Sequence, residues 1–194
     1  MRRILLLSLL FIPFVLMAQD YEGFYQKSVN INQTGMYVLG GWALANIASG
    51  AYGWKSYDGQ SKYFHQMNVM WNAVNLGIAG FGVYSALNAN PSLMSSLEML
   101  AEHKKTENIY LINAGIDVLY VAGGYYLTRL ALSKPQKHDL YRGYGKSVML
   151  QGAFLFVFDL IMYGIQSQHH SKFLDAIAYV NVSSHSLCLG FYLQ

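Results

Sequence analysis

The chain has 194 residues, of which 54% are hydrophobic and 12% are charged, whereas about a quarter of the residues of a soluble domain are charged. Its net charge is +3 and it contains no basic cluster with interleaved aromatic residues, which excludes a nucleic-acid-binding surface. The single cysteine, Cys188, excludes an intrachain disulfide and any metal centre built from several cysteines.

The N-terminal residues have the pattern of a secretory signal peptide. Arg2 and Arg3 precede an apolar run over residues 4–16, and Ala18 is a small residue at the expected cleavage point. We therefore predict a signal peptide at residues 1–18 and a single domain over residues 19–194. An uncleaved signal anchor is the alternative, and either version places the residues that follow on the outer side of the membrane.

Five long apolar stretches follow the signal, at residues 35–54, 63–87, 109–132, 147–168 and 173–193. A helix needs about 20 residues to cross a bilayer, and each stretch is long enough. The stretches are continuous rather than alternating, which is typical of helices and not of the strands of a membrane barrel. The sequence therefore predicts an all-α fold, a polytopic transmembrane bundle of four to five helices, of which the last is the least apolar.

The basic residues favour one orientation of this bundle. The connections predicted to lie inside hold seven of them, namely Lys55, Lys62, Arg129, Lys134, Lys137, Arg142 and Lys146. The segments predicted to lie outside hold four, namely Lys27, Lys104, Lys105 and Lys172. Because basic residues are enriched in cytoplasmic loops, we predict a multi-pass protein of the bacterial inner membrane with its N-terminus outside.

The outer connection at residues 88–108 has a helical pattern of its own. Asn90 and Pro91 suit the cap and the first position of a helix. The apolar residues that would share one face of it are Leu93, Met94, Leu97, Leu100 and Ala101. Two interpretations remain open: a short amphipathic helix in the headgroup region, or a connector packed over the outer end of the bundle.

Small residues recur in the first three spans. They are Gly40, Gly41, Ala45, Ala48, Gly53, Gly77, Gly80, Gly82, Gly115, Gly123 and Gly124. Helices in lipid associate through close van der Waals contact, so such residues predict the places where helices meet.

Polar residues inside the spans are the candidate functional residues. Spacings of three and four put Asn68, Asn72 and Asn75 on one helix face together with His65. Gln151, Asp159 and Gln166 lie close to one side of the fourth span. Counting about 1.5 Å per residue from the span ends brings polar groups of several helices to a similar depth. The candidate intramembrane polar site consists of Asn46, Asn68, Asn72, Asn75, Asn113, Asp117 and Asp159.

This polar layer has two interpretations. It is either a network of interhelical hydrogen bonds, each worth about 0.6 kcal/mol, that locks the bundle, or a buried site for an ion, a proton or a small ligand. The first implies a non-enzymatic structural or accessory membrane protein whose partners are the lipid bilayer and a second copy or other membrane proteins. The alternative is a small ion, proton or small-solute transporter.

No catalytic motif accompanies these residues. The chain lacks a Gly-rich phosphate loop, a His-Glu-x-x-His motif and a Gly-x-Ser-x-Gly motif. His65 and His185 are the histidines inside the spans, and their depths differ by about 9 Å, which disfavours a bis-histidine haem. His169 and His170 fall in a predicted outer loop, where a solvated turn is favoured over a metal site. We predict no enzymatic activity, no cofactor, no metal and no nucleic-acid partner.

The order of these features carries a resemblance. A signal ending in Met17-Ala18-Gln19 is followed by Phe64-His65-Gln66-Met67-Asn68 and by Trp71-Asn72-Ala73-Val74-Asn75. In this the chain resembles a family of small polytopic bacterial membrane proteins of unknown function. The resemblance implies a membrane-embedded fold and supplies no chemistry.

Overall fold

The computed structural model describes the backbone of residues 2–192 and the side chains of residues 21–177. Within these residues the chain forms four α-helices, connected by turns and short 3₁₀ segments, and no strand. The helices are α1 (Arg2–Ser56), α2 (Gly59–Leu87), α3 (Ser96–Leu130) and α4 (His138–Tyr192). The predicted all-α fold is confirmed.

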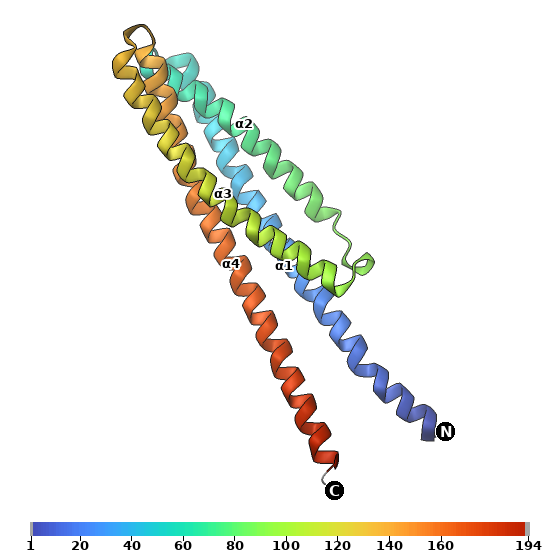
Figure 1. The fold of residues 1–194 in the computed structure, drawn as a ribbon. Helices are drawn as coiled ribbons and strands as arrows, with labels where there is room; N and C mark the ends of the chain where they lie inside the picture. The colour runs from blue at the N-terminus through green and yellow to red at the C-terminus, as the bar shows by residue number, and fades with distance from the viewer. Residues whose placement is uncertain (1, 193–194) are drawn as a thin grey trace.

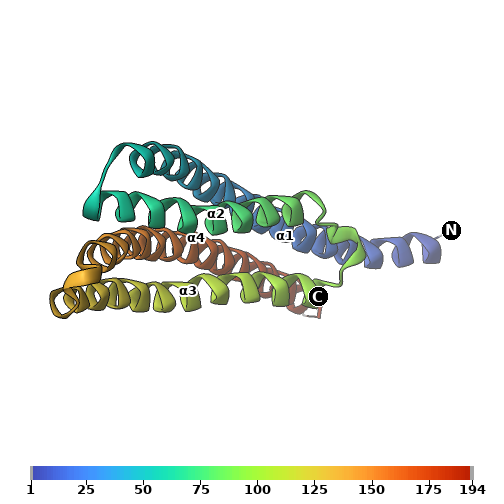
Figure 2. The ribbon, with the colours of Figure 1, turned by 90° about the horizontal axis from the view of Figure 1, so that it is seen from above.

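The four helices run up and down alongside one another (Figures 1 and 2). α2 packs along α1, α3 packs along α4, and contacts between α2 and α4 join the two pairs. The α1–α2 and α3–α4 turns lie at one end of the bundle, and the loop between α2 and α3 lies at the other (Figure 1). Both chain ends extend beyond that second end.

The helices α4 and α1 are both longer than the spans assigned to them, and the predicted boundary within α4 is wrong. α4 runs without a break through residues 169–172, so residues 147–168 and the described part of 173–193 belong to one helix, and the predicted outer loop does not exist. The reason is that neither proline nor glycine occurs between Gln166 and Phe173 to stop the helix. α1 likewise includes most of the predicted signal peptide, whose side chains lie outside the described residues.

The predicted helix start at Asn90 and Pro91 is also wrong. Pro91–Leu93 is a single 3₁₀ turn, and the α-helix begins at Ser96 after a capping box. The Ser95 hydroxyl accepts a hydrogen bond from the Glu98 backbone N–H, and the Glu98 carboxylate accepts one from the Ser95 backbone N–H at 2.7 Å. These hydrogen bonds from Ser95 lower the pKa of the Glu98 carboxyl group. A capping box begins a helix more firmly than an asparagine cap alone, because it satisfies two backbone donors at once.

The apolar face expected at residues 88–108 does not pack over the bundle. Leu93 and Leu97 are 83% and 79% exposed. The side of α3 that is buried carries Met99, His103 and Glu107 instead. The interpretation as a connector packed by its leucines is therefore wrong.

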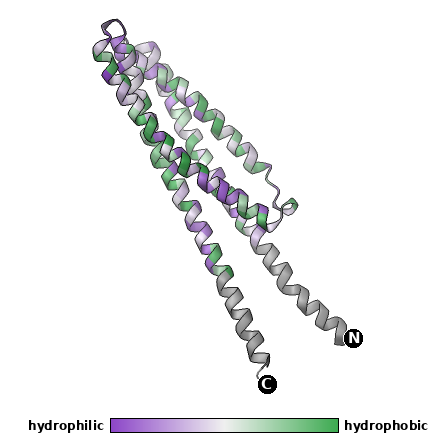
Figure 3. Ribbon diagram, in the orientation of Figure 1, coloured by the Kyte–Doolittle hydropathy of each residue, from purple (hydrophilic) through white to green (hydrophobic). Residues whose placement is uncertain are grey.

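Hydrophilic and hydrophobic residues are interspersed along all four helices (Figure 3). Among the side chains that the structure describes, eleven polar or charged ones are buried beside twelve apolar ones. Thirty large apolar side chains are exposed, and Phe81, Leu119 and Val74 are each more than half exposed. Buried polar side chains and large exposed apolar ones in such numbers are uncommon in a domain that folds in water.

One stretch of the described chain, Pro135–Ile177, is long and apolar enough to cross a membrane. Only 33% of its most apolar window is buried, so most of this window lies on the surface of the bundle. The spans predicted in α1, α2 and α3 do not reach the same hydropathy, because asparagine, glycine and aromatic residues interrupt them.

Glycines bring the backbones of α3 and α4 into contact. A Cβ atom on Gly124 would lie 2.7 Å from the Gly145 carbonyl oxygen, and one on Gly145 would lie 2.5 Å from the Gly124 carbonyl oxygen. A Cβ atom on Gly115 or Gly123 would meet nothing within 4 Å. Small residues therefore mark the α3–α4 contact at Gly124 but not at the two other glycines of that span.

Candidate functional site

The first polar cluster joins α1, α2 and α4. The Asn68 amide donates to Asn46 Oδ1 at 2.9 Å, and the Asn72 amide donates to the Asn68 backbone carbonyl at 2.8 Å. From α4, the Gln151 amide donates to Asn68 Oδ1. The Trp42 indole N–H on α1 donates to Gln151 Oε1 at 2.9 Å. Asn68 is therefore the residue at which three helices are hydrogen-bonded together.

We call this cluster the asparagine network, which consists of Trp42, Asn46, Asn68, Asn72, Asn75 and Gln151. Asn75 belongs to it through a long hydrogen bond of 3.5 Å to Asn72. Asn68, Asn72, Asn75 and Gln151 are buried, and Asn46 is half-buried. The structure thus places the three asparagines of α2 on one enclosed face.

The second polar cluster is the pair Asp117 and Asp159. Both carboxyl groups are buried, Asp117 on α3 and Asp159 on α4. Together with Asn75 and Asn113 they line a cavity of about 890 Å³ between the helices. Two ionised carboxylates that face one cavity repel each other, so a proton or a cation there would stabilise the pair.

The predicted single layer is therefore divided. Asn75, Asn113, Asp117 and Asp159 share the cavity, whereas Asn46, Asn68 and Asn72 are not among its lining residues. Counting residues along each span gives depth but not the direction in which a side chain points around the helix axis. Only the packing of the helices decides which groups of equal depth meet.

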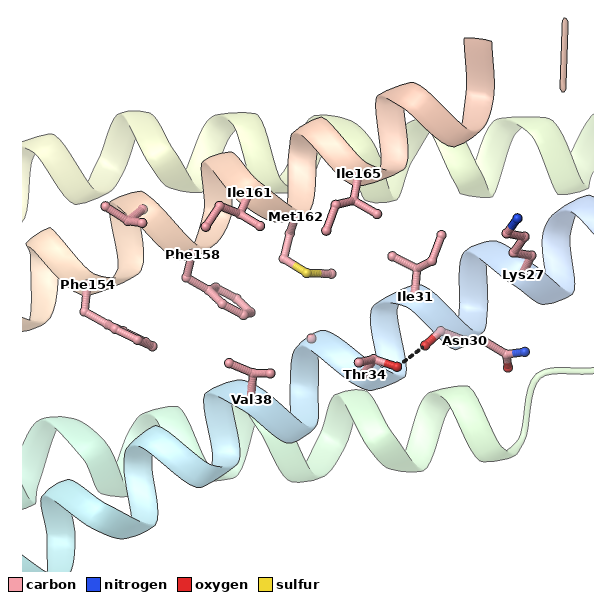
Figure 4. A pocket seen from close by; sticks show the side chains of 12 residues that line it. Lys27, Asn30, Ile31, Thr34, Val38, Phe154, Phe158, Ile161, Met162 and Ile165 are labelled. Carbon is pink, nitrogen blue, oxygen red and sulfur yellow. Dashed lines mark hydrogen bonds between the residues drawn. The ribbon is translucent and has the colours of Figure 1, made fainter. Parts of the chain in front are cut away.

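A groove between α1 and α4 has a different character (Figure 4). It encloses about 530 Å³, and Phe154, Phe158, Ile161 and Ile165 from α4 form much of its wall. Its polar residues lie on α1, where the Thr34 hydroxyl donates to a backbone carbonyl at 2.9 Å rather than into the groove. Its lining is suited to a lipid chain or an apolar side chain.

The third polar cluster, which we call the His–Glu cluster, consists of His103, Glu107 and His170. His103 and Glu107 lie one turn apart on α3, and His170 faces them from α4. One nitrogen or oxygen of each lies within 4.8 Å of the others. His170 Nδ1 is 3.3 Å from Glu107 Oε2, and Lys104 Nζ is 3.0 Å from Glu107 Oε1.

The protonation states of this cluster follow from its surroundings. Burial, and after it the nearby His170 and His169, lowers the pKa of His103 to about 4, so the His103 imidazole is neutral at pH 7. Burial works to raise the pKa of Glu107, but hydrogen bonds from Lys104 and His170 outweigh it and the pKa is lowered. The cluster thus combines a neutral imidazole with an ionised carboxylate, the two forms in which these side chains bind metals.

The sequence contained a signal for this cluster that the helix assignment concealed. His103 and Glu107 have the spacing of four that puts two side chains on one helix face. From the sequence, however, residues 88–108 are predicted to be an outer connection, and that prediction considers only the face that carries their apolar residues. His170 is assigned to a solvated turn. The His103 side chain is fully buried.

These observations define a four-helix, all-α protein with polar clusters between its helices. The chain belongs to the family of unknown function DUF6992, whose model matches residues 38–160. The match confirms the expected membership of an uncharacterised family, and it includes the asparagine network, the aspartate pair, His103 and Glu107. No curated protein and no solved structure matches the chain.

Proposed function

We propose that the protein is an integral membrane protein whose four helices cross the bilayer, and that its role is structural or accessory rather than enzymatic. The observation that carries this proposal is the distribution of side chains: thirty large apolar residues are exposed, while asparagine, glutamine and aspartate are buried. Exposed leucine and phenylalanine cost nothing against lipid chains, whereas polar groups there need partners within the protein.

The arrangement of the turns supports an orientation with the N-terminus outside. The α1–α2 and α3–α4 turns lie at the same end of the bundle (Figure 1), and these are the connections that carry most of the basic residues. The positive-inside rule places that end in the cytoplasm. Leu93 and Leu97, which are exposed at the opposite end, then lie at the outer headgroup region, as expected of an amphipathic segment.

The asparagine network supports a structural role for the interior. The Asn68 carboxamide oxygen accepts a hydrogen bond from Gln151, and the Asn68 amide nitrogen donates one to Asn46. The Gln151 oxygen accepts a further hydrogen bond from Trp42. Amides that are bonded to one another in this way join helices and have little capacity left for a ligand. The network therefore fits a lock between α1, α2 and α4.

A small-cation or proton carrier is the second candidate. The observation that favours it is the aspartate pair, because two acidic groups face a cavity and Asp117 Oδ2 has no hydrogen-bond partner among the described atoms. Ionisable residues at membrane depth commonly belong to ion or proton pathways. A proton or a monovalent cation between Asp117 and Asp159 would relieve their mutual repulsion.

Flux through proteoliposomes separates these two candidates. For a structural protein we expect vesicles with the purified chain to pass protons, Na⁺ and K⁺ no faster than vesicles without protein. A carrier would show a flux that Asp117→Asn and Asp159→Asn each reduce to the protein-free level, because the isostere removes the charge and keeps the shape. Asp139→Asn, at an exposed position near the basic end, is the control that should change nothing. A flux that depends on the two buried aspartates would replace the structural proposal by the carrier.

A further inference from the structure

We propose that His103, Glu107 and His170 form a binding site for a divalent transition-metal ion. The site lies at the end of the bundle where α3 begins, which is the end opposite the basic α1–α2 and α3–α4 turns. It is separate from the asparagine network and the aspartate pair, and it stands whether or not the protein carries ions across the membrane.

The geometry of the three side chains suits one ion. Metal–ligand bonds of about 2.0–2.1 Å place the ligand atoms of a tetrahedral site about 3.3 Å apart. His170 Nδ1 and Glu107 Oε2 are already 3.3 Å apart, and all three ligand atoms lie within 4.8 Å of one another. Small changes in side-chain torsion angles would therefore complete the coordination without movement of the helices.

A chain of hydrogen bonds fixes the tautomer of His103 in the form that binds metal. The Gln166 side-chain nitrogen lies 3.1 Å from the Ser28 backbone carbonyl, and it donates this hydrogen bond because a carbonyl can only accept. The Gln166 side-chain oxygen therefore faces the Ser28 hydroxyl. That hydroxyl donates to Gln166 Oε1 at 3.1 Å. Its oxygen must then accept the Nδ1 proton of His103, which is 2.7 Å away. His103 Nε2 is left with its lone pair free.

This lone pair is the strongest sign of a ligand. His103 is fully buried, and Nε2 has no hydrogen-bond partner among the described atoms. Buried polar atoms are almost always bonded, so one without a partner needs an explanation. An ion held also by Glu107 and His170 supplies the missing partner, whereas hydrogen bonding within the cluster leaves Nε2 unsatisfied.

Neighbouring residues enclose the site on one side and leave it open on another. Phe24 of α1 is buried, and its ring lies 4.7 Å from that of His103 and stacks on His169 at 4.6 Å. The His169 ring donates through Nε2 to the Phe24 carbonyl at 2.9 Å, and His169 is not among the three residues whose ligand atoms lie close together. The His170 side chain is 20% exposed and forms the entrance.

The donor set indicates the class of metal. Two imidazole nitrogens and one carboxylate oxygen suit Zn²⁺, Fe²⁺, Co²⁺ or Ni²⁺, whereas Mg²⁺ and Ca²⁺ prefer oxygen ligands alone. Three protein ligands leave at least one coordination position for water or another small ligand. Lys104 competes with the ion, because its ammonium group neutralises the Glu107 carboxylate and occupies Oε1.

The test uses the full chain purified in detergent and stripped of metal with a chelator. We expect it to bind one equivalent of Co²⁺ with visible absorption bands of a site of low coordination number, and Zn²⁺ to displace the Co²⁺. Glu107→Gln and His170→Gln should each weaken Co²⁺ binding by about 100-fold or more, because loss of a residue that only orients a ligand already costs about 10–100-fold. Ser28→Ala should weaken it by about 10–100-fold for that reason. His138→Gln, at the opposite end of the bundle, should leave it unchanged.

Lys104→Met tests the site even where the ligand variants fold poorly. It removes the competing cation and frees Glu107 Oε1, so Co²⁺ should bind more tightly than to the unaltered chain, a gain that misfolding cannot produce. Zn²⁺ should also raise the Tm of the unaltered chain and not that of His170→Gln, since a ligand of the native state stabilises it. Absence of Co²⁺ binding, equal binding by His170→Gln, or binding no tighter in Lys104→Met would each overturn the proposal.

Discussion

Replacement of Gly145 by leucine is expected to separate α3 from α4 and to prevent the bundle from folding. A Cβ atom at Gly145 would lie 2.5 Å from the Gly124 carbonyl oxygen and 2.9 Å from the Thr128 backbone nitrogen. These are backbone atoms of a regular helix and cannot turn aside as a side chain would. Overpacking among side chains already costs about 1–3 kcal/mol, so a larger loss is expected here.

Gly123→Leu provides the matched control for this substitution. Gly123 is adjacent to Gly124, yet a Cβ atom there would meet nothing within 4 Å. A glycine inside a helix also costs about 0.5–1 kcal/mol relative to alanine, so Gly123→Leu should leave the free energy of unfolding unchanged or raise it. Denaturation in mixed detergent micelles, followed by circular dichroism, measures both. Equal stability of the Gly145 and Gly123 variants would contradict the observed helix contact.

Asn68→Leu should destabilise the bundle by about 2 kcal/mol, through the loss of hydrogen bonds that are worth about 0.6–1.7 kcal/mol each within membranes. The substitution removes the acceptor for Gln151 and the donor to Asn46, which leaves buried groups of α4 and α1 without partners. Asn88→Leu is the control, because Asn88 is exposed and its amide bonds only to the carbonyl of Tyr84 in the preceding turn. The free energy of unfolding in mixed micelles is again the measurement.

The double variant Asn68→Leu with Gln151→Leu tests the mechanism of that loss. Removing both partners of a buried hydrogen bond costs less than the sum of the two single changes, because neither partner is then left without the other. We expect the double variant to be more stable than additivity predicts. Additive losses would show that Asn68 and Gln151 do not act on each other.

The sequence predicts the helix faces of this protein well and their partners poorly. Spacings of three and four identify the common face of Asn68, Asn72 and Asn75, and the structure buries all three. Nothing in those spacings shows that Asn68 meets Gln151 while Asp117 meets Asp159. Which residues pair depends on the rotation of each helix about its axis, and that is set by contacts such as the one between Gly124 and Gly145.

The His–Glu cluster escaped prediction for a related reason. Its residues come from two segments that hydropathy assigns to connections, since residues 88–108 and 169–172 are too polar for membrane spans. Residues 96–108 and 169–172 are helical, because neither part contains a residue that stops a helix. A search for helix breakers rather than for apolar length would have placed His103, Glu107 and His170 on helices, although not side by side.

The central claim is that the helices cross the membrane with the basic turns inside, and cysteine labelling in intact cells tests it most directly. In a chain whose single cysteine is replaced by Cys188→Ser, one new cysteine is introduced at Ser133, in the α3–α4 turn, or at Ser92, in the α2–α3 loop; both positions are exposed. A membrane-impermeant thiol reagent should label Ser92→Cys at once and Ser133→Cys only after the cells are permeabilised. Labelling of Ser133→Cys in intact cells with protection of Ser92→Cys would reverse the orientation, and equal labelling of both would contradict a bundle that spans the membrane.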